Sequence, residues 1–535
     1  MANRQYVGAR YVPKFADPVE WNGALSYEAL TIVTHLGNSF TSKKPVPAGI
    51  DIGNTEYWVN TGNYNEQLAN CENQIIAFSK KLELLKDYTS VYEFGAVGDG
   101  VHDDTDSFVA ALNSEHNIIV VPSGVYKITK SVNIPENKTL MGCSGISPKW
   151  NGEKWVLYPG TTIAVYHGRN VSSATFVLNN GSTICDMSFY YPEVGGSQEN
   201  PIEYSPCIES QGTNVSDNTY ATNDFRIVNC KFSNPYIAIN LKERHSNAII
   251  KNCQMWYWYR GIVIDGSYDT DKVYDVRCSP VYAYIGDWGT YPNTAAKKTA
   301  ENENSASFVI KKADLSIFEN CFVWGGRNAF LFEKSQTGFA SGCQFINCSA
   351  EQCEIIFYMK NYAQQLEIRG GAVGACTEII KAPWGGEASY EKDTFANNII
   401  TDLKCWGECK HGINLDNCCG FIFNSCSFNS IGRDVAFDTA GAITVTNSKK
   451  VFFENCCVLI NDFKAKPSYV YLDNVTKTLF ECNKLMNLNV DKAGVTILSG
   501  NNIAFVNTTF VDTTTPSIYK PASVTNFTET GTVTM

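Results

Sequence analysis

The 535-residue sequence lacks an excess of positive charge and lacks long apolar segments. It carries 43 Lys and Arg residues against 54 Asp and Glu residues, a formal net charge of −11, and no basic run offsets that balance. Nucleic acid is therefore not expected as the main ligand, because phosphate backbones are held by clustered Lys and Arg. The apolar runs are too short for a membrane-spanning helix, so membrane insertion is not expected either.

The first residues also lack the pattern of a secretion signal. The segment Met-Ala-Asn-Arg-Gln-Tyr is not a charged stretch followed by an apolar core, so the sequence predicts a protein that is made and kept inside a cell until something releases it. In that setting the 20 cysteines are expected to remain thiols. One cluster has metal-like residues, Cys405, Cys409, His411, Cys418 and Cys419, but its spacing fits no closed zinc module. No metal or cofactor is therefore predicted.

What the sequence has instead is an internal repeat. Short β-prone segments recur, mostly 23–30 residues apart, around an anchor that is usually Asn or a small residue and is often followed by Cys. The longer gap before Asn320 is interpreted as one coil with an insertion over roughly 284–306, and the gap before Ser425 has room for two coils. The anchors are Asn229, Asn252, Cys278, Asn320, Asn347, Gly370, Ser425, Asn455, Cys482 and Asn507. Helical periodicity and the Leu-x-x-Leu-x-Leu frame are both absent, so the pattern predicts an all-β fold, a right-handed parallel β-helix. Each anchor Asn is expected in a left-handed turn, bonded to the Asn of the next coil.

A more specific pattern precedes the repeat. Residues 91–142 contain Phe94-Gly95-Ala96-Val97-Gly98-Asp99-Gly100, then Asp103-Asp104-Thr105, then Val121-Pro122-Ser123-Gly124-Val125-Tyr126. This segment resembles the first coil of the pectate-lyase-like superfamily, in particular that of viral tailspikes and tail appendages. The acidic cluster is interpreted as structural: Asp103 or Asp104 is expected to cap a short helix over 106–112 that plugs the end of the solenoid.

Two further pieces lie upstream. Residues 5–64 resemble small chitin-binding modules and the N-terminal segments of appendage proteins from phages of Gram-positive hosts, with Trp21, Tyr27, Tyr57 and Trp58 among their aromatic residues. These aromatics can form the module's own core or stack on sugars, and docking to the virion is the favoured role. The predicted domains are 1–64 (aromatic β-module), 65–90 (helical neck), 91–142 (first coil and cap), 143–515 (β-helix body) and 516–535 (C-terminal tail).

The neck prediction depends on a heptad stripe. Apolar residues follow one another at spacings of 4 and 3: Tyr64, Leu68, Cys71, Ile75, Phe78, Leu82 and Leu85. Such a seam is typical of a coiled coil, although a stripe this short also suits a helix packed on its own domain. Next to a tailspike-like β-helix, a parallel three-stranded neck is favoured, and it makes the protein a homotrimer.

Binding chemistry is expected on the outside of the coils, because their interiors are packed. Four residues after successive anchors the sequence places Trp256, Tyr282, Trp324 and Glu351. Since stacked strands lie about 4.8 Å apart, these side chains are predicted to form one column on which a sugar chain stacks. Trp258, Arg260 and Arg327 are expected to border the column and to pair with anionic groups. An ion-paired sheet face and a contact between protomers are the alternatives.

Candidate acids and bases lie beside this column. The outward position before the anchor is predicted to carry Lys251, Arg277 and Glu319 in successive coils. Hydrolysis of a glycoside needs two carboxylates about 5–10 Å apart, supplied by Glu319 with Glu351 or Glu354, or by Asp265 with Glu333. A lyase would use Asp275 as a base beside Arg260 or Arg277. The six histidines lie outside the column, and no Ser-His-Asp arrangement is evident.

Three functions follow from these features. The expected one is a phage tailspike or tail appendage that recognises and degrades a host cell-surface glycan or teichoic acid during adsorption. A catalytically inactive receptor-binding or structural spike and a cellular polysaccharide lyase or hydrolase are the alternatives. The expected partners are two further copies of the chain, virion tail or collar proteins through the N-terminal region, and the host polymer. The expected location is the virion tail, after synthesis in the host cytoplasm.

Overall fold

The computed structural model describes residues 19–62, 64–151, 153–194, 202–211, 222–242, 244–281, 302–384, 396–431, 441–460, 468–487, 494–511 and 518–535. The chain divides into two compact units, Met1–Asp87 and Tyr88–Met535. Each unit is described by itself below. None of the helices in the described part of the chain combines the length and the apolar character needed to cross a bilayer.

The first unit begins with a small sheet of four strands, β1 (Val19–Glu20), β2 (Ile32–His35), β3 (Asn38–Ser42) and β4 (Trp58–Gly62). Its core consists of Val33, Val46, Ile52 and Trp58. Trp58 is 2% exposed, and the ring of Tyr27 meets it edge to face with centroids 5.3 Å apart. Several of the predicted aromatics thus serve the module's own core, which a domain this small requires.

Helix α2 (Tyr64–Leu85) follows the sheet. The side chains of the heptad stripe that the structure describes are not covered by other residues of the same chain. Leu68 is 60%, Ile75 65% and Phe78 64% exposed, and Cys71 is exposed as well. The helix ends at Leu85, earlier than the predicted boundary at residue 90, because Tyr88–Ser90 already form a strand of the second unit, β5.

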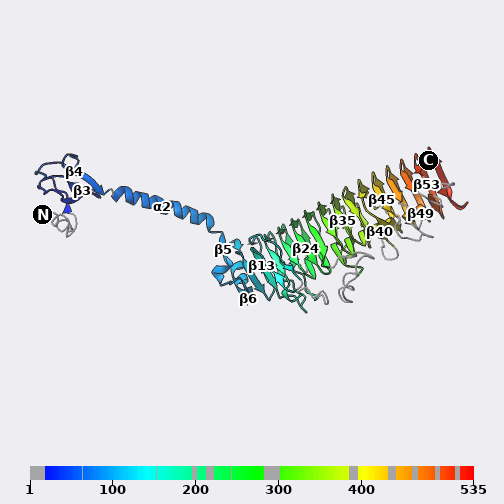
Figure 1. Ribbon diagram of the computed structural model, residues 1–535, viewed down its shortest axis with the longest axis horizontal. Helices are drawn as coiled ribbons and strands as arrows, with labels where there is room; N and C mark the ends of the chain where they lie inside the picture. Colours follow the sequence, from blue (N-terminus) through cyan, green and yellow to red (C-terminus); the bar gives the residue numbers. More distant parts are fainter. Residues whose placement is uncertain are drawn as a thin grey trace. The chain divides into compact units, whose positions relative to one another are not determined.

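The second unit is a parallel β-helix, in which three ladders of strands run side by side along the coils (Figure 1). The first ladder contains β5 (Tyr88–Ser90), β7 (Ile118–Val120), β10 (Thr139–Met141), β15 (Thr183–Cys185), β19 (Arg226–Val228), β23 (Ile249–Lys251), β26 (Lys272–Tyr274), β30 (Ile317–Glu319), β34 (Gln344–Ile346), β38 (Glu367–Arg369), β41 (Asn398–Thr401), β44 (Cys419–Asn424), β47 (Lys449–Glu454), β50 (Val475–Glu481), β53 (Gly500–Val506) and β56 (Thr525–Thr530).

The second ladder contains β6 (Asp99–Asp103), β8 (Gly124–Ile128), β13 (Thr161–Val165), β16 (Ser188–Tyr190), β20 (Lys231–Ser233), β24 (Gln254–Tyr257), β27 (Arg277–Pro280), β31 (Phe322–Trp324), β35 (Ser349–Glu351), β39 (Ala372–Gly374), β42 (Lys404–Cys405), β45 (Ser427–Ile431), β48 (Cys457–Ile460), β51 (Lys484–Asn487), β54 (Thr509–Val511) and β57 (Val533–Thr534).

The third ladder contains β9 (Val132–Ile134), β14 (Phe176–Leu178), β17 (Ile208–Ser210), β21 (Ile237–Leu241), β25 (Arg260–Ile264), β28 (Ala306–Ile310), β32 (Asn328–Phe332), β36 (Ile355–Met359), β40 (Cys376–Pro383), β43 (Cys409–Asp416), β46 (Gly441–Thr446), β49 (Ser468–Asp473), β52 (Val495–Ile497) and β55 (Ile518–Tyr519). Short additional strands pair at the corners, and the predicted fold class, an all-β parallel β-helix, is confirmed.

A column of left-handed residues forms the turn between the first and second ladders. Its members have φ between +49° and +67°: Asp186, Asn229, Asn252, Asp275, Asn320, Asn347, Gly370, Asp402, Ser425, Asn455, Cys482 and Asn507. The amide of Asn252 donates to the side-chain oxygen of Asn229 at 2.8 Å, as the repeat predicted. One anchor was misplaced, because the left-handed residue of its coil is Asp275 and not Cys278.

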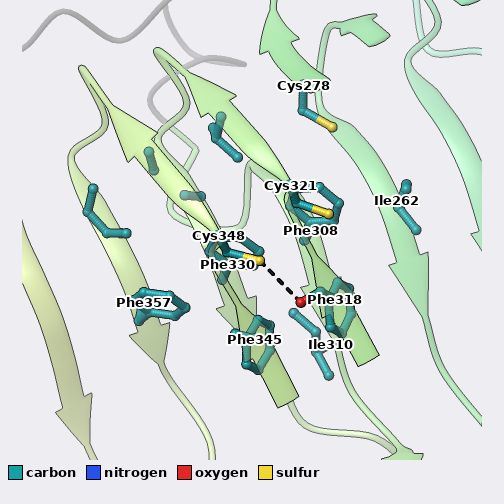
Figure 2. Close-up of a cluster of buried hydrophobic side chains, with 14 of the residues drawn as sticks. Ile262, Cys278, Phe308, Ile310, Phe318, Cys321, Phe330, Phe345, Cys348 and Phe357 are labelled. Atoms are coloured by element: carbon teal, nitrogen blue, oxygen red, sulfur yellow. Dashed lines mark hydrogen bonds between the residues drawn. The ribbon is translucent and has the colours of Figure 1, made fainter. Parts of the chain in front are cut away.

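Aromatic rings stack along the interior (Figure 2). Phe318 and Phe345 lie 4.8 Å apart and nearly parallel, and Phe423 and Phe453 stack in the same way at 4.7 Å. All four are fully buried. The stacking follows from in-register parallel strands, which place identical side chains directly above one another.

The cysteines beside the left-handed turns are buried and also act as hydrogen-bond donors. Cys348 Sγ donates to the carbonyl oxygen of Phe318 in the preceding coil at 3.3 Å, the bond drawn in Figure 2. In later coils Asn483 and Thr508 make the equivalent bond. Burial raises the pKa of Cys253 to about 12, so this thiol stays protonated at neutral pH. These cysteines are therefore structural.

The two ends of the β-helix differ. Helix α3 (Thr105–Leu112) plugs the first coil with Phe108 and Leu112. Of the two predicted capping residues, Asp103 accepts the backbone N–H of Thr105 at 3.1 Å, and Asp104 makes no capping hydrogen bond. Asp104 is 1% exposed and instead accepts the backbone N–H of Val97 at 2.6 Å, which holds the loop before the helix. At the other end, the predicted tail 516–535 is instead a further coil over its described residues, where β55, β56 and β57 pair with the preceding strands.

Candidate functional site

One outward column on the second ladder gathers the exposed tryptophans. Trp256 pairs with Ser279, and Trp324 pairs with Glu351, which pairs with Gly374. The next rung brings Trp406 level with Gly374, since the backbone N–H of Trp406 donates to the carbonyl oxygen of Val373 at 2.9 Å. The column over consecutive rungs is Trp256, Ser279, Trp324, Glu351, Gly374 and Trp406. We call this column the tryptophan track.

Exposure separates these rings from the other tryptophans. Trp256 is 37%, Trp324 40% and Trp406 54% exposed, and they are the tryptophans of the described residues that present a large open surface. The indole of Trp406 lies over Gly374: a Cβ at Gly374 would be 2.9 Å from that ring. The glycine therefore leaves room for the indole beside the strand.

The predicted column was partly out of register. Tyr282 lies outside the described residues, and its predicted place is occupied by Ser279, because the left-handed residue of that coil is Asp275. Trp406 was missed, because its coil has Asp402 and Leu403 where other coils have Asn and Cys. The signal was present, since Trp406 follows Asp402 by four residues, as Trp256 follows Asn252 and Trp324 follows Asn320.

Cations flank the track in the neighbouring outward column. That column carries Gln254, Arg277, Phe322, Ser349, Ala372 and Lys404. Arg277 and Lys404 are exposed, and neither makes an ion pair within the described part of the chain. Arg277 therefore does belong beside the tryptophans, although its predicted column was wrong: Lys251 is followed by Tyr274 and then by Glu319.

The predicted carboxylates do not come together. Glu319 ends a strand of the first ladder, on the other side of the left-handed turn from Glu351. Asp275 is itself a turn residue. Glu351 is the carboxylate of the track, half-buried and without a side-chain hydrogen bond or ion pair to the described residues. Glu351 is thus free to meet a ligand, but its proposed partner Glu319 faces away.

The remaining candidates are committed elsewhere. Trp258 is 3% exposed and belongs to the core, so it cannot stack on a sugar. Arg260 bonds Glu333 at 2.5 Å, and Arg327 pairs with Glu354. The alternative pair Asp265 and Glu333 is bridged by Lys311, which lies 3.7 Å and 3.6 Å from them. These carboxylates are therefore engaged by cations of the protein itself.

The metal-like cysteines are also accounted for. Cys409 Sγ lies 3.1 Å from Cys376 Sγ and 3.5 Å from Cys405 Sγ, all three buried. Burial raises the pKa of Cys376. In the part of the chain that the structure describes, no group of three His, Cys, Asp or Glu residues is arranged to ligate a metal ion.

Comparison with known proteins gives the following similarities. Residues 88–183 match the family model of rhamnogalacturonase A/epimerase, pectate lyase-like. A curated relative, the non-secreted LysM effector LysM19 of Penicillium expansum, is 42% identical over 55 residues, which are 10% of this chain; the match spans 4% of the relative's length. The A-module of mannuronan C-5 epimerase AlgE6 from Azotobacter vinelandii is 12% identical, with 83% of this chain and 99% of that chain covered and a TM-score of 0.42.

A phage protein is also similar. The pre-mature gene product 12 of bacteriophage phi29 is 12% identical, with a TM-score of 0.45, and the alignment covers 86% of this chain and 59% of that one. This chain therefore spans about three fifths of the phage protein's length.

Proposed function

We propose that this chain is a phage tail appendage that binds a host cell-surface glycan or teichoic acid through the tryptophan track. The observation that carries the proposal is the placement of Trp256, Trp324 and Trp406 in one outward column with open ring surfaces. Indole faces stack on sugar rings, and a regular row of them on a rigid sheet holds a ligand without ordering a loop. The appendage role rests on the resemblance of residues 91–142 to tailspikes.

Degradation of the bound polymer is the extension of this proposal. The match of residues 88–183 to a pectate-lyase-like family is consistent with a polysaccharide lyase or hydrolase. On the track, Glu351 is the side chain available for an acid–base step, because Glu354 is engaged by Arg327. An inactive receptor-binding spike of the same fold is the alternative, and a cellular polysaccharide lyase or hydrolase is the other.

Assembly into a homotrimer completes the proposal. The open heptad stripe of α2 supports a parallel neck, since a single chain leaves Leu68, Ile75 and Phe78 in water. On the first ladder, half-buried apolar residues form an outward column suited to side-by-side contact: Ile399, Ile422, Phe452, Leu479 and Ala504. Contact through that face leaves the tryptophan track on the second ladder free. Residues 1–64 are proposed to dock to the virion tail or collar.

The binding proposal is tested with purified host wall polymer. Trp324→Ala is expected to weaken binding about 2- to 12-fold, as loss of one ring contact implies. Tyr519→Ala, which removes a ring that is 53% exposed on the third ladder, is the matched control and should leave binding unchanged. Equal changes in binding affinity for the two variants would contradict glycan binding at the tryptophan track. Release of reducing ends or glycerol units by the wild-type protein, abolished in Glu351→Gln, would establish degradation by this site.

The assembly proposal has its own test. Light scattering is expected to give three times the 59.2 kDa of the chain. Ile75→Asp should lower that mass, whereas Ile76→Asp, at an exposed position one residue off the seam, should not. A wild-type mass of one chain would refute the trimer.

A further inference from the structure

Trp406 changes the extent of the site. With Trp256 and Trp324 alone, the exposed rings are two rungs apart, whereas Trp406 lies three rungs beyond Trp324 in the same column. Five rung steps correspond to roughly 24 Å along the β-helix at about 4.8 Å per step. A ligand that touches all three rings must therefore be extended and must run along the coils.

Charge gives the chemical class of this ligand. Arg277 and Lys404 lie on the same face as the track, on the second and sixth of its rungs, so about 19 Å separates the two rungs. Both are exposed and free of ion pairs within the described residues, although the chain as a whole has a net charge of −11. Two unneutralised cations on an acidic protein are placed to meet an anionic partner.

Glu351 and Gly374, which lie between these cations, determine which groups of the ligand fit there. Glu351 lies between Trp324 and Gly374 in the column and repels a negative group, so that part of the ligand must present hydroxyl groups or another neutral portion. Gly374 leaves room for Trp406, because a Cβ there would lie 2.9 Å from the indole. The site thus has defined places for rings, for negative charge and for neutral groups.

We propose, building on the glycan-binding function above, that the track binds one extended anionic glycopolymer parallel to the β-helix axis, from Trp256 to Trp406, with Arg277 and Lys404 neutralising its charges. Uronate polymers and phosphodiester polymers share this chemistry. A second copy of the chain is the competing occupant of the same face.

The test uses oligogalacturonates of graded length, poly(glycerol phosphate) and a neutral oligosaccharide of matched length as probes, with binding measured by calorimetry. The wild-type protein should bind at least one polyanion and prefer it to the neutral probe. Affinity should rise with length until an oligomer reaches about 24 Å. The polyanion that binds better identifies the source of the negative charge.

Trp406→Ala should weaken binding of long oligomers about 2- to 12-fold and leave short oligomers unaffected. Gly374→Ala should have the same selective effect with Trp406 still present, since its Cβ would lie 2.9 Å from both the indole and the backbone nitrogen of Gly407 and so displace the segment that carries the ring. Ala372→Ser, at an exposed position of the neighbouring column on the same strand, is the matched control and should bind normally.

Removing both the Arg277 and the Lys404 side chain should lower the number of counterions released on binding by about two, measured as a shallower slope of the logarithm of the affinity against the logarithm of the salt concentration. Glu351→Gln should strengthen binding of the polyanion.

Several results would overturn the inference. Equal losses for short and long oligomers in Trp406→Ala, or binding that ignores charge, would contradict an extended anionic ligand. If Trp256→Ala and Trp324→Ala weaken binding while Trp406→Ala and Gly374→Ala do not, this inference fails and the proposed function stands. If none of the three tryptophan variants alters binding, the proposed function fails. A fall in the mass of the assembly in Trp406→Ala would assign the face to a second copy.

Discussion

The inner and outer columns of the same β-helix use one spacing for opposite purposes. Inside, Phe318, Phe345 and their neighbours stack ring on ring with no exposure. Outside, the tryptophan track alternates large rings with Ser279, Glu351 and Gly374. The interior must fill a constant volume in every coil, so it tolerates little variation. The outer face carries no such constraint, so large side chains there are available for binding.

The largest expected loss of stability comes from Phe453 on β47, whose neighbour Phe452 lies on the opposite face of the strand. Phe453 points inward and is fully buried between Phe423 and Phe480, whereas Phe452 points outward and is half-buried. Phe453→Ala should lower the free energy of unfolding by about 3–5 kcal/mol, because it leaves a cavity in the stack. Denaturant unfolding measures this loss. Tyr519→Ala, at an outward position of the third ladder that is 53% exposed, is the control and should cost much less. Similar losses would show that the inner and outer assignments are wrong.

Thiol chemistry sharpens the same comparison. Burial raises the pKa of Cys253 from 9.0 to about 12, so its thiolate population falls about a thousandfold. Alkylation at pH 8 followed by mass spectrometry should therefore label the exposed Cys143 and Cys482 and spare Cys253 until the protein unfolds. Above about pH 9 the thiol of Cys253 ionises in the unfolded chain but stays protonated in the folded protein. The free energy of unfolding should therefore decrease as the pH rises above about 9. Rapid labelling of folded Cys253 would contradict its buried position.

The left-handed turn gives a smaller effect. Asn252 has φ +52° and donates to Asn229, so Asn252→Ala should cost about 1–2 kcal/mol through backbone strain and the lost hydrogen bond. Asn252→Gly should cost less, because glycine adopts this conformation freely. Thermal unfolding distinguishes the two variants. Equal losses would mean that the hydrogen bond, and not the backbone conformation, selects Asn here.

The smallest expected effect is on the outer face. Trp324→Ala should lower the free energy of unfolding by about 1 kcal/mol, since the ring is 40% exposed and loses only part of the burial that a fully buried Phe453 loses. Together with a loss of glycan binding, this result would separate function from stability. A loss of several kcal/mol would instead identify Trp324 as a packing residue.

The β-helix itself could be predicted from the sequence, because each coil repeats the same local requirements. A left-handed anchor, an inward apolar residue two positions before it and usually a small buried residue after it recur in each coil, mostly 23–30 residues apart, and these are short-range demands. The candidate site was predicted less completely. Trp256, Trp324, Arg277 and Glu351 do share one face, but Trp258 is buried, and Glu319 and Glu351 lie on different ladders.

What the sequence alone determined is the repeat, the interior and the anchor chemistry, because they depend on neighbours within one coil. Only the tertiary structure decided which coils place their outward residues in one line. The anchor at Asp275 shifts its coil by three residues from the assignment at Cys278, and this shift replaces Tyr282 with Ser279 in the column. A surface made of one residue per coil depends on the pairing of successive coils, which the chain sets through backbone hydrogen bonds between rungs rather than through the spacing of residue types.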